Sequence, residues 1–180
     1  MALTRLGPNN SANISGINLT SQVTGTLPAA NGGTGSTTFS PGKVGQVVST
    51  AYATDTFTSS DSLVATGHIA TLTPSATSSK ILIILGIANA YVNSGNRDMV
   101  INFYSSIGGA SYSNIISAGQ VRDTVRTGFG GNHYLYSPST TSSVAIQTYF
   151  SRIHSGTGSV YYMNAATNTS ANLTLMEVLA

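Results

Sequence analysis

Few side chains in this sequence are suited to acid–base chemistry. Its 180 residues include only five carboxylates, namely Asp55, Asp61, Asp98, Asp123 and Glu177. Glycoside cleavage requires two carboxylates that flank one bond. Asp55 and Asp61 fall in a Ser/Thr-rich stretch, and Asp98 follows Arg97 in a predicted turn, where a carboxylate commonly caps backbone N–H groups. We therefore expect no catalytic pair and interpret the protein as a non-enzyme.

The sequence also lacks the motifs of nucleophilic, phosphate-binding and metal chemistry. It has no Gly-x-Ser-x-Gly elbow, and Gly32-Gly33-Thr34-Gly35 is not followed by the Lys-Ser/Thr of a phosphate loop. Without cysteine there is neither a disulfide nor a thiolate zinc site. The three histidines, His68, His133 and His154, are far apart in sequence, so we expect no metal and no cofactor. One histidine from each of three chains meeting on an axis is the alternative.

Tyrosine is the residue type best suited to a binding role. There are nine Tyr, five Phe and no Trp, and a Tyr ring joins a flat apolar surface to a polar tip. The densest polar and aromatic neighbourhood surrounds a predicted turn at residues 128–131. It predicts a receptor contact, with framework or a subunit interface as the alternative. Its members are Arg122, Asp123, Arg126, Phe129, His133, Tyr134 and Tyr136.

The composition predicts an all-β protein. Charged residues make up 7% of the chain, against about 25% in typical soluble domains. Ser, Thr and Asn supply more than a third of the residues, and they disfavour helix interiors. Seven basic residues without a large cluster argue against nucleic-acid binding. The longest apolar stretch, 81–92, contains Asn89 and is shorter than the ~20 residues of a membrane span, so we expect no membrane insertion.

Short strands separated by turns are predicted throughout residues 41–180. Lys80–Val92 is apolar on both parities, which predicts a central strand covered on both faces. Met99–Ile107 alternates and predicts a half-buried strand, and Asn172–Val178 is expected inside a sheet. The spacing predicts an antiparallel β-sandwich of the jelly-roll kind. The other predicted strands are Val44–Ala51, Leu63–Thr73, Tyr112–Ala118, Val121–Thr127, His133–Tyr136, Val144–Ile153 and Val160–Met163.

Residues 1–40 are predicted to form an extended N-terminal arm, because their aliphatic residues are too dispersed for an independent core. One reading is an unstructured tail. The other is an arm whose three copies bury one another's aliphatic side chains along an axis, with glycines allowing close approach. This segment includes a Gly-rich joint, where backbone angles with φ > 0 are permitted. The arm contacts are assigned to Ile14, Ile17, Leu19, Val23 and Leu27, and the joint to Pro28, Gly32, Gly33 and Gly35.

The segment LPAANGGTGSTTF at 27–39 resembles the junction of bacteriophage tail-fibre and related virion appendage proteins. Residues 42–50 and 171–178 resemble the start and end of a C-terminal β domain in fibres of marine and cyanobacterial phages. The resemblance implies a homotrimer that is assembled in the bacterial host cytoplasm and located in the virion. Its arm would attach to other virion proteins of the tail, baseplate, neck or capsid.

Three functions remain open at this point. The leading expectation is a short trimeric tail fibre whose β domain binds a host-surface glycan or protein. The first alternative is a capsid decoration or cement protein, whose arm clamps neighbouring shell subunits and which has no receptor. The second is a stand-alone trimeric sugar-binding module like the tumour-necrosis-factor-like or C1q-like jelly rolls.

Overall fold

A computed structural model describes residues 43–93, 98–122, 127–153, 159–163 and 170–179. The chain divides into two compact units, Met1–Pro41 and Gly42–Ala180. The first unit lies outside the described residues. The arm contacts assigned to Ile14, Ile17, Leu19, Val23 and Leu27, and the joint assigned to Pro28, Gly32, Gly33 and Gly35, therefore stay predictions.

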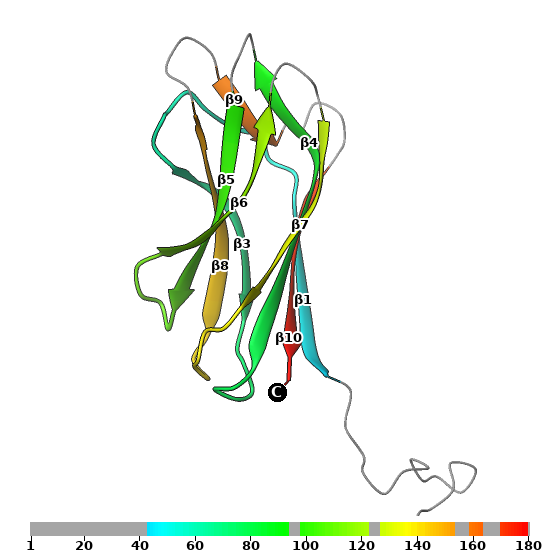
Figure 1. The fold of residues 1–180 in the computed structure, drawn as a ribbon, viewed down its shortest axis with the longest axis vertical. Coiled ribbons are helices and arrows are strands. Elements are labelled where there is room, and N and C mark those ends of the chain that lie inside the picture. The colour runs from blue at the N-terminus through cyan, green and yellow to red at the C-terminus, as the bar shows by residue number, and fades with distance from the viewer. Residues whose placement is uncertain (1–42, 94–97, 123–126, 154–158, 164–169, 180) are drawn as a thin grey trace, which may run out of the picture. The chain divides into compact units, whose positions relative to one another are not determined.

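The second unit is built from antiparallel strands in two sheets (Figure 1). Sheet one has the order β1-β10-β4-β9-β2, with β7 also pairing β4, and sheet two has the order β3-β8-β5-β6. Within the described ranges, no helix is long and apolar enough to cross a membrane. The strands are β1 (Val44–Tyr52), β2 (Thr56–Thr58), β3 (Val64–Leu72), β4 (Lys80–Asn93), β5 (Asp98–Ile107), β6 (Ser113–Arg122), β7 (Thr127–Tyr136), β8 (Val144–Arg152), β9 (Ser159–Met163) and β10 (Ala171–Val178).

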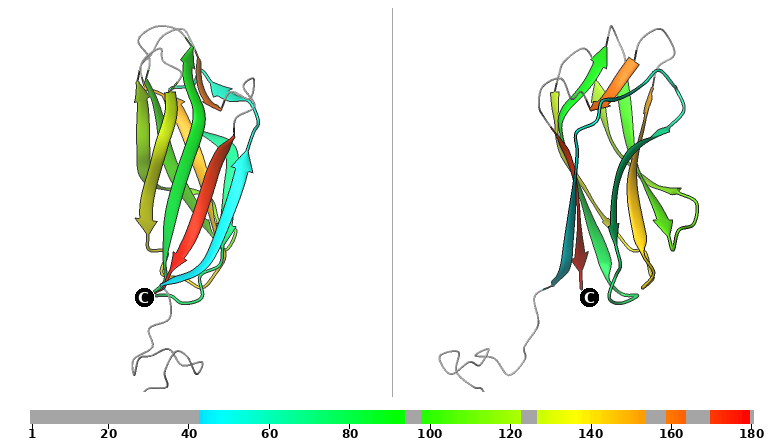
Figure 2. Two further views of the ribbon diagram at one scale, coloured as in Figure 1. Left: turned by 90° about the vertical axis from the view of Figure 1, so that its right-hand side faces the viewer. Right: turned by 180° about the vertical axis from the view of Figure 1, so that it is seen from behind.

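The strand order is that of a jelly roll, with β2 and β9 as additions. The first strand pairs with the last, and strands β1, β10, β4 and β7 lie opposite β3, β8, β5 and β6. Figure 2 (left) shows β7, β4, β10 and β1 side by side in sheet one. The predicted all-β, antiparallel sandwich is thereby confirmed.

Alternating side chains from both sheets form the core. On β4, Ile81, Ile83, Leu85 and Ile87 are each no more than 2% exposed. Their parity matches the twofold repeat of a strand, in which every second side chain points to the same face. The other large, fully buried side chains are Leu72, Met99, Ile101, Phe103, Ile146, Phe150, Tyr162 and Leu173.

The prediction that Lys80–Val92 forms a central strand is confirmed, but the prediction that both of its faces are covered is not. β4 is central, because β10 and β9 pair with it on one side and β7 on the other. Its second face is not covered by the described part of the chain, where Leu82 and Ile84 are half-buried. The β10 prediction is confirmed, since β10 lies between β1 and β4.

The predicted turn at 128–131 is wrong. β7 runs without interruption from Thr127 to Tyr136, and its register with β4 shifts between the pairs Leu85↔Asn132 and Ile87↔Phe129. Glycines inside a strand commonly mark such bulges, and Gly130 and Gly131 lie at this shift. Similarly, the two strands predicted for 112–118 and 121–127 are one strand, β6, up to Arg122. The short strand β2 was not predicted.

Replacing Leu175 tests the core. Leu175→Ala should lower the free energy of unfolding by about 2–5 kcal/mol, because the truncated side chain leaves a cavity between the sheets. Ile69→Ala, at a position 38% exposed on β3, is the control and should cost less than about 1 kcal/mol. Urea denaturation measures both. Equal losses would contradict the assignment of inner and outer faces.

Candidate functional site

His68 is a buried titratable group that joins the two sheets. Its Nε2 lies 3.0 Å from the Thr50 carbonyl oxygen and its Nδ1 lies 2.8 Å from the Tyr162 hydroxyl. A carbonyl only accepts, so Nε2 carries the proton and Nδ1 accepts from Tyr162. Burial lowers the pKa of His68, although the Thr50 bond opposes this. The ring is neutral and 1% exposed, which suits a structural bridge rather than catalysis.

Hydroxyl groups extend this bridge through the core. The Tyr52 ring stacks on His68 with centroids 5.1 Å apart, and its hydroxyl donates to the Thr66 carbonyl at 2.6 Å. The Thr66 and Thr148 hydroxyls lie 2.7 Å apart, and the His68 backbone N–H donates to Thr66 Oγ1. Buried polar groups are stable when they are paired in this way. The network therefore fixes how sheet one sits on sheet two.

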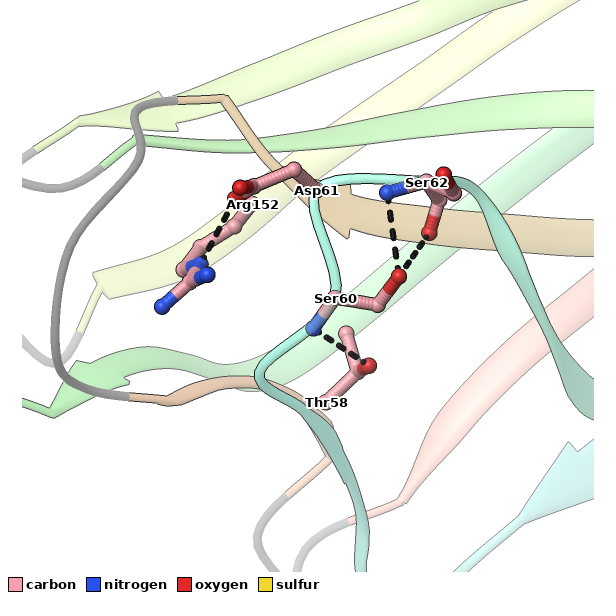
Figure 3. A network of polar contacts seen from close by, with 5 residues as sticks. All are labelled: Thr58, Ser60, Asp61, Ser62 and Arg152. Carbon is pink, nitrogen blue, oxygen red and sulfur yellow. Dashed lines mark hydrogen bonds and ion pairs between the residues drawn. The ribbon is translucent and has the colours of Figure 1, made fainter.

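A second polar centre holds the β2–β3 loop against the end of β8 (Figure 3). Arg152 Nε donates to Asp61 Oδ1 at 2.8 Å, and the Arg152 backbone N–H donates to the Ser60 carbonyl at 2.9 Å. Ser60 also bonds Ser62 and Thr58 within the loop. Arg152 is buried whereas Asp61 is about half exposed. The carboxylate of Asp61 thus acts as the counter-ion of a buried guanidinium.

Glu177 forms a third polar centre, where β1, β10 and the β3–β4 loop meet. Its Oε1 accepts from both the backbone N–H and the hydroxyl of Ser75 at 2.6 Å, and its Oε2 accepts from Gln46 Nε2 at 2.9 Å. Burial alone would raise the pKa of Glu177, but these hydrogen bonds outweigh it and lower the pKa from 4.5 to about 2. A Cβ at Gly45 would lie 2.8 Å from Oε2, so the glycine leaves room for the carboxylate.

The described carboxylates and histidines do not gather into a metal site. Within the described ranges, no group of three or more His, Asp or Glu residues is placed to hold an ion. His133 is exposed on β7, far along the chain from His68 in the core, and His154 lies outside the described residues.

The predicted receptor cluster does not form one surface among its described members. Tyr134 and Tyr136 point inward and pack against the core, and the Tyr136 hydroxyl lies 3.1 Å from Ser105 Oγ. His133 has the opposite parity on β7 and is exposed. Arg122 ends β6, where its backbone pairs with that of Asp98. Asp123 and Arg126 lie outside the described residues.

The outer face of sheet one carries an aliphatic row across four strands. Val47 on β1 pairs with Met176 on β10, Met176 pairs with Leu82 on β4, and Leu82 pairs with Leu135 on β7. We call these four residues the aliphatic row. Val47 is 55% and Leu135 is 45% exposed. Cross-strand partners share a face, so the four side chains are neighbours on the surface.

The outer face of sheet two gathers three tyrosines that the sequence did not group. The rings of Tyr104 on β5 and Tyr149 on β8 stack, with centroids 4.0 Å apart and an interplanar angle of 26°. Tyr112, in the β5–β6 hairpin, lies with its ring centroid 6.3 Å from that of Tyr149. Figure 1 shows this hairpin projecting from the side of the sandwich. We call Tyr104, Tyr112 and Tyr149 the tyrosine face.

Amide side chains surround these rings. Asn102 pairs with Tyr149, and Tyr104 pairs with Gln147 on one side and with the exposed Asn114 on the other. Asn102 is 7% exposed, and its Oδ1 has no hydrogen-bond partner among the described residues. A buried acceptor without a donor costs about 1–3 kcal/mol. Partial burial, followed by the proximity of Tyr149, raises the pKa of Tyr112.

Comparison with known proteins gives little. No family model and no curated protein matches the chain. Among solved structures, the VP2 subviral particle of infectious bursal disease virus is 12% identical, with a TM-score of 0.35 over 75% of this chain and 37% of that chain. The structure of the Gt strain of the same virus is 14% identical, with a TM-score of 0.31 over 86% of this chain and 43% of that chain. The chain spans less than half of these proteins, and similarity at this level carries no functional argument.

The carboxylate of Glu177 should make stability depend on pH. Because its pKa is lowered on folding, its contribution is complete above pH 4.5 and is lost as the pH falls toward 2. Glu177→Gln should therefore be less stable than wild type at pH 7, and the gap should close between pH 4.5 and 2. Thermal unfolding at a series of pH values measures this gap. A gap of constant size down to pH 2 would contradict the carboxylate's role.

Proposed function

We propose that the protein is a non-enzymatic structural protein of a phage virion, a short trimeric tail fibre. Its N-terminal arm fastens it to the particle, and its β domain faces the host surface. The aliphatic row is the observation that supports an oligomer. The resemblance of residues 27–39 to phage appendage junctions supports a location in the virion. The same resemblance is the reason for proposing a trimer rather than another oligomer.

The aliphatic row needs a cover, because contiguous apolar surface exposed on a soluble protein commonly marks an interface. The adjacent row is formed by Ser49, Thr174, Ile84 and His133, so neither row contains Asp, Glu, Lys or Arg. Copies of these two rows can meet without like-charge repulsion, and the exposed Lys80 of β4 lies at the margin of the face. We assign the cover to the neighbouring copies of the chain in the trimer, because one face meeting itself about a twofold axis would give a dimer.

The position at which the chain enters the β domain supports this assignment. The Lys43 carbonyl accepts from the Leu179 backbone N–H at 2.7 Å, so residue 43 lies beside the end of β10. Lys43 is followed directly by β1, and β1 carries Val47 of the aliphatic row. Copies that meet through sheet one would therefore bring their Lys43 residues near one another.

A charge placed in the row should separate the copies. We expect the full-length chain to sediment at three times its 18.5 kDa mass and Leu135→Lys to sediment as a monomer, because the lysine would have to be buried without a partner. Ile69→Lys, at a comparably exposed position of sheet two, is the control and should remain trimeric. A monomeric wild type, or a trimeric Leu135→Lys, would contradict the proposal.

Location in the particle distinguishes a fibre from a decoration protein. A reconstruction of the virion should place the chain in a few symmetric sets on the tail. Hundreds of copies spread over the shell would instead identify a capsid cement protein and overturn the fibre assignment. A trimer absent from purified particles would overturn both and favour a stand-alone module.

A further inference from the structure

We infer that the tyrosine face is a binding site for an uncharged glycan. This inference rests on the proposed function, because it names the site and the ligand class through which the β domain would contact a host. Sugar rings present C–H faces that pack on aromatic rings and hydroxyls that bond amides. Tyr104, Tyr112 and Tyr149 offer the rings, and the exposed Asn114 offers an amide beside them.

The charge of this surface selects a neutral ligand. The outward residues of β5 from Val100 to Ser106, and their partners on β6 and β8, include no Asp, Glu, Lys or Arg. Recognition of carboxylated or sulfated sugars uses charge-assisted bonds from Arg or Lys, which these positions do not provide. A neutral saccharide loses little on leaving water when amides replace its hydrogen bonds.

Asn102 gives an independent indication of a ligand. Its side chain is more than nine-tenths buried on the tyrosine face, between Tyr149 of β8 and Ser117 of β6, and its carbonyl oxygen lacks a donor among the described residues. A hydroxyl that reaches this oxygen would satisfy it. Because the Asn102 side chain is buried, the Tyr149 ring must shift as the ligand hydroxyl enters.

A protein partner fits this surface less well. Stable protein interfaces cover about 800 Å² on each side and concentrate Trp, Tyr and Arg near their centre. The described outward positions between Val100 and Ser106 supply Tyr104 but neither Trp nor Arg. Strands rather than loops carry Tyr104 and Tyr149, so the backbone that positions the two rings is preformed.

The test is titration of the full-length oligomer with methyl glycosides of glucose, galactose, mannose, rhamnose and N-acetylglucosamine, with sialic acid as the anionic probe. Saturation-transfer NMR detects binding, and tyrosine emission reports stacking without interference because the chain has no Trp. At least one neutral sugar should bind saturably and sialic acid should not. Binding by none of the five, or binding of sialic acid alone, overturns the inference.

Three variants locate the site. Tyr112→Ser lies in a hairpin and leaves the sheets intact; it should weaken binding about tenfold, and Tyr149→Phe should retain most of the affinity because the ring remains. Thr54→Ala, at an exposed position of the β1–β2 loop outside both faces, is the control and should bind as wild type does. Unchanged binding by Tyr112→Ser overturns the site. Sedimentation of the same samples reports the oligomer separately, so lost sugar binding in an intact trimer leaves the proposed appendage standing.

Discussion

The apolar character of β4 on both of its faces is the constraint around which the domain is arranged. Ile81, Ile83 and Leu85 are fully buried toward sheet two. Leu82 and Ile84 lie on the opposite face, where the described part of the chain supplies no cover. One sandwich can bury one face of each sheet. The second face of β4 is therefore left for another layer, and we propose that identical copies of the chain provide it.

The scarcity of charge gives the remaining surfaces their roles. Three of the few charged groups, Glu177, Arg152 and Asp61, secure loops to strands at the ends of the sheets. The aliphatic row and the tyrosine face are left uncharged as a consequence. Hydroxyl and amide side chains then supply solubility. The outer face of sheet one is aliphatic, whereas the outer face of sheet two is aromatic. We propose self-association for the aliphatic face and ligand binding for the aromatic face on the basis of that difference.

Local sequence patterns predicted most of the strands but did not predict which strands pair with one another. The alternation of Met99, Ile101 and Phe103 correctly gave the inward face of β5. Gly130 and Gly131 suggested a turn because glycine permits turns and bulges alike, and only the pairing of β7 with β4 distinguishes them. Tyr104 and Tyr149 are 45 positions apart, so their stacking depends on the pairing of β5 with β8. Nothing in either local sequence specifies that pairing.

Thiol accessibility tests the central claim, that other copies of the chain cover the outer face of sheet one. The chain has no cysteine, so Ala51→Cys on β1 and Ala65→Cys on β3 each introduce a unique thiol at an exposed alanine on opposite outer faces. Rates of maleimide labelling of the full-length protein should be much slower at position 51 than at position 65, and the two should converge when Leu135→Lys is added. Equal rates in the otherwise unmodified protein would contradict the account.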